Sequence, residues 1–403
     1  MSADTPTLPR AARVATWGFF GLNGFVLGAW VVHIPVVEHD TGISHSTLGA
    51  LLLVFGGAAF AGMQVTGPLA DRFGHRVVVP AAAVLLCVAV LGPGLATGPW
   101  ALGAALVVFG LGNGALDVAM NAHAVEVERA YGRPVMSAFH AVFSIGGAAA
   151  AGLGALVLGR VPTELTLGCV GAAGLLTAAV SARFLLPGRP AAEAAADTGA
   201  TTRAPRRLVW LLGGLAFALM LSEGVAYDWA AVHLRDVVDT PPGVAALAYG
   251  AFSVAMTVGR FTADAVAARF GAVRVVRHGA ALAAVGLAGA ALSPWAVPAI
   301  AGWAVFGVGL SGCVPQLFTA AGNLDPRSSG ALLARVVGLG YLGLLAGPAV
   351  IGGLTHWVAL NTAFALPVAL CVVGAVGARV LRPATGADAP GAPGTTTAGT
   401  ARP

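Results

Sequence analysis

The most constraining feature of this sequence is a series of twelve long apolar segments. A helix needs about 20 predominantly apolar residues to cross the hydrocarbon core of a bilayer, and each segment is long enough. The chain is 57% hydrophobic and only 10% charged, whereas soluble domains carry about 25% charged residues. We therefore predict an all-α membrane protein with twelve transmembrane helices. The predicted spans are 14–37, 46–70, 76–96, 99–122, 135–159, 163–186, 208–233, 243–267, 273–292, 295–320, 330–355 and 357–379.

The arginines lie almost entirely on one side of the predicted spans. Arg160 and Arg235 fall in the opposite loops and Arg260 falls within a span, but every other arginine is in a segment on the side of the termini. Because arginine-rich loops stay in the cytoplasm, both termini are predicted to be cytoplasmic. The net charge of +5 does not indicate nucleic acid binding, because the arginines are spread over short loops.

The two halves of the chain repeat each other. The segment "RFGHRVVV" (72–79) recurs as "RFGAVRVV" (269–276), and "FGLG" (109–112) recurs as "FGVG" (306–309). Repeats of this length predict two pseudo-symmetric six-helix bundles. The predicted organisation is a cytoplasmic N-terminus (1–13), an N-terminal six-helix bundle (14–186), a cytoplasmic linker (187–207), a C-terminal six-helix bundle (208–380) and a disordered cytoplasmic tail (381–403).

The predicted loop between the second and third spans, "GPLADRFGHR" (67–76), carries a recognisable pattern. It resembles the loop 2–3 signature of the major facilitator superfamily, and the resemblance extends over about residues 14–380. The resemblance implies a monomeric, multi-pass protein of the bacterial plasma membrane in which this loop is a conformational latch. In that latch, Asp71 would meet a helix N-terminus or an arginine of the other half. The expected latch residues are Gly67, Asp71, Arg72, Gly74 and Arg76.

The second-half copy of this loop has Ala268 at the position of Asp71. It carries Arg260 and Asp264 one helical turn apart instead. Residues with this i, i+4 spacing face each other on a helix, so we expect an ion pair that neutralises both groups. A structural role is favoured for this pair over a functional one.

Polar side chains concentrate in four of the predicted spans. In members of the superfamily the first, fourth, seventh and tenth helices line the central cavity, and the same spans of this chain hold the polar groups. The spans three and nine, by contrast, have apolar middles. The candidate cavity residues are Asn23 in span one, Asn113, Asp117 and Asn121 in span four, His140 in span five, Glu223 and Asp228 in span seven, and Gln316 in span ten.

Asp117 is the most informative of these residues. With Asn113 and Asn121 it forms a stripe at i, i+4 and i+8 on one helix face. Placing an aspartate at mid-membrane costs roughly 2.5–3.5 kcal/mol on insertion scales, so it should face protein or water. It can be a proton or substrate site, or a structural hydrogen-bonding group to a neighbouring helix.

A narrower resemblance concerns the stretch "LDVAMN" (116–121). It is similar to the helix-four pattern of the proton-coupled fucose permeases, with Asp117 in place of the proton-carrying glutamate. Those permeases also carry an essential aspartate in helix one, where this chain has Gly24. Along the repeat Gly24 lies opposite Glu223, so we hypothesise that the second acid has moved to span seven. His140 falls where the permeases have a sugar-contacting glutamine, although a satisfied buried histidine is also compatible.

These observations predict a secondary active transporter of the major facilitator type. The favoured function is proton-coupled symport of a small polar, sugar-like solute by alternating access. The alternative is a proton-driven efflux antiporter for lipophilic compounds or metabolites. No nucleotide-binding loop, metal-ligand cluster or nucleophile–base pair is present, so we expect no enzymatic activity, no cofactor and no metal. The expected partners are the lipid bilayer, a small-molecule substrate and protons.

Overall fold

The computed structural model describes residues 8–187, 205–325 and 328–381. All regular secondary structure within these ranges is helical, and twelve helical segments of the described chain are long and apolar enough to span a membrane. The N-terminal half contains α1 (Leu8–Thr41), α2 (His45–Phe73), α3 (His75–Ala89), α4 (Leu91–Leu95), α5 (Pro99–Tyr131), α6 (Met136–Val157) and α7 (Thr163–Ala182). The C-terminal half contains α9 (Arg206–Asp236), α10 (Pro242–Phe270), α11 (Ala272–Leu292), α12 (Ala296–Leu310), α13 (Cys313–Gly322), α14 (Ser329–Leu354), α15 (Leu360–Ala363), α16 (Ala365–Gly377) and the 3₁₀ turn η1 (Ala378–Leu381).

Three of the predicted spans are interrupted, and each interruption lies three or four residues before a proline. The α3–α4 break precedes Pro93, the α12–α13 break precedes Pro315 and the α15–α16 break precedes Pro367. A proline ring clashes with the carbonyl four residues earlier and lacks an N–H, so the helix is disrupted at that point. Other prolines, at 35, 68, 80 and 348, lie inside continuous helices. The second break matters for the site because it separates α13 from α12, and α13 contacts both α5 and α6 of the N-terminal bundle.

The same tight turn joins α2 to α3 and α10 to α11. Gly74 has φ 78° and Gly271 has φ 84°, a backbone conformation that glycine adopts without strain. Each glycine ends one helix and begins the next, and each N–H bonds back to the preceding helix, to Ala70 or to Ala267. The repeated sequence therefore folds into a repeated turn.

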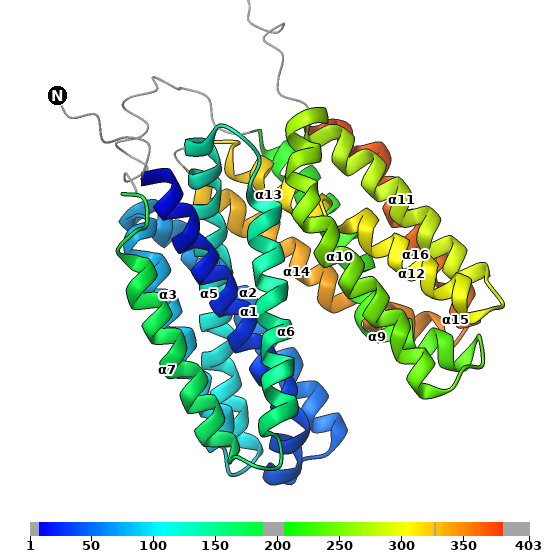
Figure 1. Cartoon of the computed structure of the whole chain (residues 1–403), viewed down its shortest axis with the longest axis horizontal. Coiled ribbons are helices and arrows are strands. Elements are labelled where there is room, and N and C mark those ends of the chain that lie inside the picture. The colour runs from blue at the N-terminus through cyan, green and yellow to red at the C-terminus, as the bar shows by residue number, and fades with distance from the viewer. Residues whose placement is uncertain (1–7, 188–204, 326–327, 382–403) are drawn as a thin grey trace, which may run out of the picture.

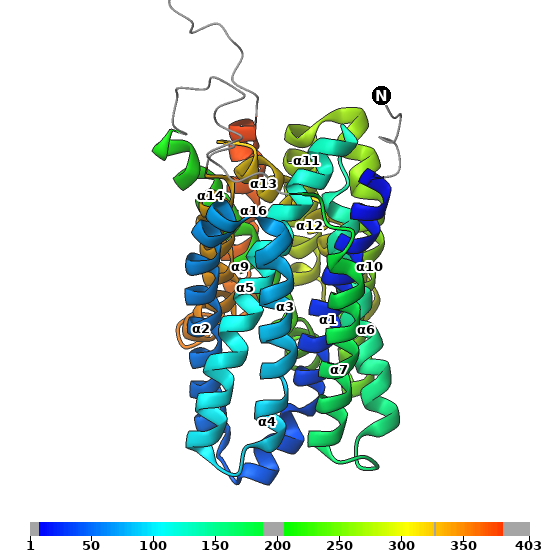
Figure 2. The ribbon, with the colours of Figure 1, turned by 90° about the vertical axis from the view of Figure 1, so that its left-hand side faces the viewer.

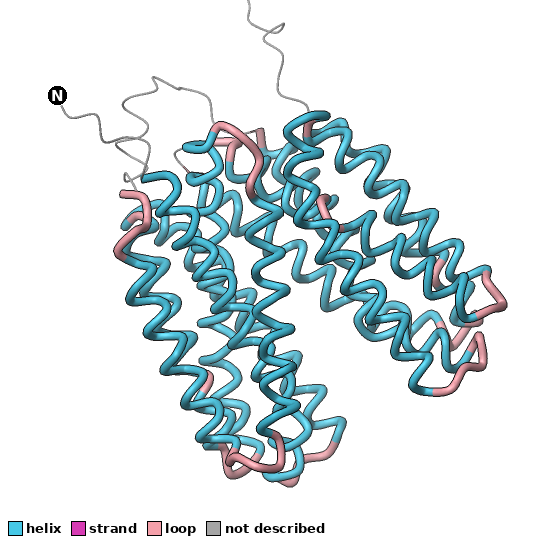
Figure 3. The backbone as a smooth tube through the Cα atoms, viewed as in Figure 1, coloured by secondary structure: helices cyan, strands magenta, loops and turns pink. Residues whose placement is uncertain are grey.

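The helices form two bundles that meet near the side from which α1 starts and diverge toward the other side (Figures 1 and 3). We call the side where α1 begins and η1 ends the terminal side. The helices of the N-terminal bundle run side by side from the terminal side toward the opposite side (Figure 2). The bundles contact each other mainly through α2 with α14 and through α6 with α10.

Each bundle has its own apolar core. The core of the C-terminal bundle also includes Met63, Val118 and Ala122 of the N-terminal bundle, which shows where the two cores fuse across the interface. Most of the predicted linker and tail fall in 188–204 and 382–403, outside the described residues. The first helix begins at Leu8, several residues before the predicted start of the N-terminal bundle.

Candidate functional site

Asp71, which lies near the end of α2, joins the two bundles on the terminal side. Its two carboxylate oxygens accept hydrogen bonds from the backbone N–H groups of Gly330 (2.8 Å) and Ala331 (2.9 Å). These amides belong to the first turn of α14 in the other bundle, where helical N–H groups lack intrahelical partners and the helix dipole favours a negative charge. Gly67 allows this approach, because a Cβ there would lie 2.6 Å from the Gly330 carbonyl oxygen.

The other latch residues have different surroundings. Gly74 makes the turn between α2 and α3. Arg72 and Arg76 are exposed, and the Arg72 guanidinium lies over the Phe73 ring. His75, which follows Gly74, is buried, and its Nε2 lies 3.3 Å from the carboxylate of Glu126. Of the predicted set, Asp71 and Gly67 directly contact the opposite bundle.

Asp264 makes the reciprocal contact from the C-terminal bundle. Its carboxylate accepts hydrogen bonds from the backbone N–H groups of Ser137 (2.9 Å) and Ala138 (2.8 Å) at the start of α6. Glu128 accepts hydrogen bonds from the two preceding backbone N–H groups, those of Val135 (2.7 Å) and Met136 (2.9 Å). Four consecutive N–H groups at this helix start are therefore satisfied by two carboxylates.

Relative to the internal repeat, the two cross-bundle contacts differ by one helical turn. The carboxylate and the amides that it binds are both shifted by this amount, so the contact is preserved. Asp71 lies three residues before the turn glycine Gly74, whereas Asp264 lies seven residues before Gly271. When the two halves are aligned by their turn glycines, the α14 amide that Asp71 binds lies one helical turn earlier in the sequence than the α6 amide that Asp264 binds. Sequence alignment of the two halves hides this equivalence because neither carboxylate matches the other position by position.

The expected ion pair between Arg260 and Asp264 is wrong. Arg260 instead lies 3.3 Å from the carboxylate of Glu223, and Asp264 is engaged with the α6 amides. The i, i+4 spacing allows a contact on α10, but both side chains bind partners on other helices, Arg260 on α9 and Asp264 on α6. Arg260 therefore belongs to a polar cluster between helices, whereas the sequence interpretation assigned it to a local structural pair.

Glu223 and Arg260 organise a polar cluster that joins the two bundles. The Tyr227 hydroxyl donates to Glu223 Oε1 (2.7 Å). The guanidinium of Arg260 donates to Ser144 Oγ (2.6 Å) across the interface, and the Ser144 hydroxyl donates to the His140 carbonyl (3.2 Å). A single arginine thus connects α9 and α10 with α6.

Asp117 is a buried acid of the N-terminal bundle, on α5. It is 4% exposed, and its neighbours on the α5 stripe, Asn113 and Asn121, are 3% and 0% exposed. The Asn121 amide donates to the Asp117 carbonyl oxygen (2.8 Å) and lies 3.5 Å from its carboxylate. From the other bundle, the side chain of Tyr341 on α14 interacts with this carboxylate and lies within electrostatic reach of Glu223 and Arg260.

Many buried polar atoms in this region have no partner among the described residues. A buried unsatisfied polar atom costs about 1–3 kcal/mol, so each of these atoms is a candidate to hydrogen-bond a solute or a water molecule. The unpartnered atoms at predicted site residues are Asn23 Oδ1, Asn113 Oδ1, Asp117 Oδ2, Asn121 Oδ1, His140 Nε2 and Gln316 Nε2.

Aromatic rings border this polar region. The His140 ring packs against Phe20 (centroids 5.3 Å apart) and against Phe318 (5.9 Å). Phe20 belongs to α1 and Phe318 to α13, so the histidine lies at a junction of both bundles. The structure does not bring the predicted site residue Asp228 into the cluster: it is exposed on α9 and forms no ion pair with a described residue.

The residues that the sequence interpretation missed are Arg260, Ser144 and Tyr341. Arg260 carried a usable signal, because a charged residue inside a span is functional by default, but the nearby Asp264 offered a simpler explanation. Tyr341 lies in span eleven, which was not expected to contribute to the cavity. No group of three or more potential metal ligands is present in the described part of the chain.

Together these features define a class of protein: a membrane transporter built from two helical bundles with a polar site between them. A family model described as Major Facilitator Superfamily matches residues 16–234. An uncharacterized MFS-type transporter of Yersinia pestis is 35% identical over 372 residues, covering 92% of this chain and 95% of the relative. The chain therefore belongs to the major facilitator superfamily.

Two other similarities bear on the fold and on the range of related proteins. The structure of the transporter FucP in the outward conformation matches with a TM-score of 0.76 and 14% identity over 92% of this chain and 98% of that chain; FucP is described as the fucose:proton symporter of E. coli. A gentisate transporter of Corynebacterium glutamicum is 26% identical over 86% of this chain and 81% of its own length. The fold is thus that of a fucose-permease-like member of the superfamily.

Proposed function

We propose that this protein is a proton-coupled symporter of a small, hydroxylated polar solute. The observation that carries the proposal is the buried cluster in which Asp117 from one bundle and Glu223 from the other lie among unpartnered amide and imidazole atoms. Amide groups can both donate and accept hydrogen bonds, as hydroxyl recognition requires. The relationship to the FucP fold supports the same assignment.

Asp117 is the proposed proton site. One of its carboxylate oxygens has no partner, and its contacts, Asn121 and Tyr341, are neutral. A carboxylate buried without a countercharge favours its protonated form. Glu223 differs because Arg260 and Tyr227 both bind it. We propose that protonation of Asp117 accompanies solute binding, while release of Arg260 from Glu223 accompanies the change of conformation.

The paired carboxylates on the terminal side are the proposed gate. With Asp71 and Asp264 bound to helix starts of the opposite bundle, the terminal side is held closed. We propose that the termini are cytoplasmic, so that this conformation faces outward, and that the protein acts as a monomer in the bacterial plasma membrane. The arginine distribution supports this orientation.

The central arginine adds a feature that the sequence interpretation did not include. Arg260 is a bidentate donor suited to a carboxylate, and a relative of the chain is a gentisate transporter. We therefore include sugar acids and other hydroxylated organic acids in the proposed solute class, with the solute carboxylate replacing Glu223 at Arg260.

The second candidate function is proton-driven efflux of lipophilic compounds. The Gly347–Pro348 step in α14 resembles an antiporter glycine–proline motif and favours this candidate. The many polar atoms at the centre oppose it, because a pocket for lipophilic compounds should be mainly apolar and aromatic.

Proteoliposomes loaded with a pH-sensitive dye test the proposal. L-Fucose, D-xylose, D-galacturonate and gentisate are added outside, and internal acidification is followed. The expected result is acidification with at least one of these solutes, at least ten-fold slower in Asp117→Asn, while solute exchange across the membrane persists because exchange requires no net proton movement. Solute uptake without proton movement in the wild type would contradict proton coupling.

A further inference from the structure

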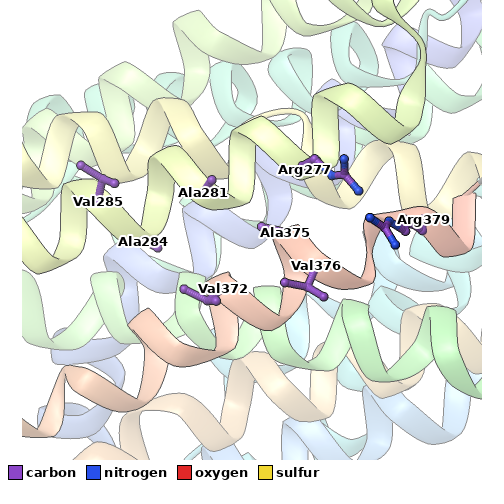
Figure 4. A pocket seen from close by; sticks show the side chains of 8 residues that line it. All are labelled: Arg277, Ala281, Ala284, Val285, Val372, Ala375, Val376 and Arg379. Atoms are coloured by element: carbon purple, nitrogen blue, oxygen red, sulfur yellow. The ribbon is translucent and has the colours of Figure 1, made fainter.

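A groove of about 520 Å³ runs along the outer face of the C-terminal bundle between α11 and α16. Its walls are built from alanine and valine, including Val285 of α11 and Val372 and Val376 of α16 (Figure 4). At one end of the groove, Figure 4 shows the guanidinium groups of Arg277 and Arg379 next to each other. Neither arginine is part of the central site.

The apolar walls face outward within membrane-length segments. Val285 is 68% exposed and Val376 is 70% exposed, and both lie in segments long and apolar enough to span a membrane. In a bilayer, side chains at this depth contact acyl chains. The groove is therefore suited to an apolar chain that lies along the protein, with Arg277 and Val285 separated by roughly 12 Å at 1.5 Å rise per residue.

The two arginines lie near the terminal-side ends of two membrane-length segments. Arg277 is in the second turn of α11, which begins there, and Arg379 is in η1, which ends the last span. Neither guanidinium forms an ion pair or hydrogen bond with the described residues. Two like charges at one groove end repel each other, and an anion placed between them relieves that repulsion.

We infer that this groove binds an anionic phospholipid, with the phosphate held between Arg277 and Arg379 and an acyl chain along the valine wall. Basic pockets between helix ends at the cytoplasmic surface are suited to anionic headgroups. The combination of charge and apolar groove favours a diacyl lipid over a free phosphate ion, which would leave the apolar walls without an occupant.

Native mass spectrometry of the full-length protein in detergent tests this inference. Dioleoyl phosphatidylglycerol is titrated against dioleoyl phosphatidylcholine, and retained lipid is counted. The wild type should retain phosphatidylglycerol preferentially. The variant Arg277→Gln/Arg379→Gln should bind it about 25-fold more weakly, because each arginine near an anionic headgroup contributes roughly five-fold to affinity.

The matched control is Arg269→Gln/Arg274→Gln, which removes two exposed arginines from the same end of the same bundle, outside this groove. It should change phosphatidylglycerol affinity less than three-fold. Should the arginine variant fold poorly, Val376→Trp fills the groove from an exposed position and should also weaken binding. Equal retention of the two lipids, equal loss in the control, or full competition by inorganic phosphate at millimolar concentration would overturn the inference.

Discussion

Asp71 of α2 and Asp264 of α10 each accept two backbone hydrogen bonds from the first turn of a helix in the opposite bundle. The two contacts are related by the internal repeat, yet the two aspartates are not aligned in it. The closed terminal side is therefore symmetric in geometry although its sequence signature is present in the first half alone. This symmetry predicts that the two carboxylates are equivalent in function.

Replacing either carboxylate should weaken closure of the terminal side by a similar amount. For Asp71→Asn and for Asp264→Asn we expect a loss of about 1–2 kcal/mol, roughly a 5- to 30-fold change in the ratio of the two conformations, because a charge at a partly buried helix start is removed. Spin labels at Arg160→Cys and Arg235→Cys, on the side opposite the termini, report the change in a Cys169→Ala background. The population with a short distance between the labels should grow.

Asp239→Asn provides the control for this experiment. Asp239 is exposed and has φ 57°, a conformation that asparagine tolerates, so its replacement should leave the label distances unchanged. Ligand binding should survive in both latch variants. Unaltered distance distributions in Asp264→Asn would show that the reciprocal contact does not contribute to closure.

Arg260 should be coupled energetically to Glu223 and uncoupled from Asp264. Removing one partner of a buried ion pair leaves an uncompensated charge, so Glu223→Gln alone should destabilise by about 3 kcal/mol. Combining it with Arg260→Met should recover part of that loss, giving a coupling energy of about 1–3 kcal/mol in a double-mutant cycle.

The same cycle between Arg260→Met and Asp264→Asn is the matched comparison, with thermal unfolding of the purified variants as the measurement. Its coupling energy should stay below about 0.5 kcal/mol. A larger coupling energy of Arg260 with Asp264 than with Glu223 would contradict this assignment and support the local ion pair that the i, i+4 spacing on α10 predicts.

Gly24 explains why the first span lacks a carboxylate. A Cβ at this position would overlap the carbonyl oxygen of Phe143 on α6, so the close packing of α1 against α6 excludes every larger residue. Gly24→Ala should lower stability by about 2 kcal/mol through overpacking, measured by thermal unfolding. Gly250→Ala is the control, because nothing lies within 4 Å of its Cβ position, and this change should be neutral or slightly stabilising. Equal effects of the two changes would contradict the packing explanation.

The sequence predicted the fold well because its signals are local. Apolar segment length determines the spans, and the glycines of the repeated loop determine the turns at Gly74 and Gly271. The helix interruptions were not predicted, although their positions follow from Pro93, Pro315 and Pro367. Other helices of this chain contain a proline and remain continuous. The presence of a proline alone therefore does not determine whether a helix is interrupted.

The central site could be predicted in part. The sequence indicated Asp117 and its asparagine neighbours as candidate site residues, because polar groups on one face of an apolar helix are energetically costly and therefore informative. Arg260 was assigned to the wrong partner because its contacts with Glu223 and Ser144 join three helices. Spacing along one helix carries no information about distances between helices.

The most direct test of proton coupling is ligand-induced thermal stabilisation of the purified wild type and of Asp117→Asn at acidic and at neutral pH. The probes are L-fucose, D-xylose, D-galacturonate, gentisate and tetraphenylphosphonium. A ligand at 100 times its dissociation constant stabilises by about 2.7 kcal/mol, which is readily detected. We predict that a sugar or hydroxylated acid stabilises the wild type more strongly at acidic pH, and that this pH dependence disappears in Asp117→Asn. Stabilisation by tetraphenylphosphonium alone, or an unchanged pH dependence in the variant, would contradict the role of Asp117 in coupling protons to a polar solute.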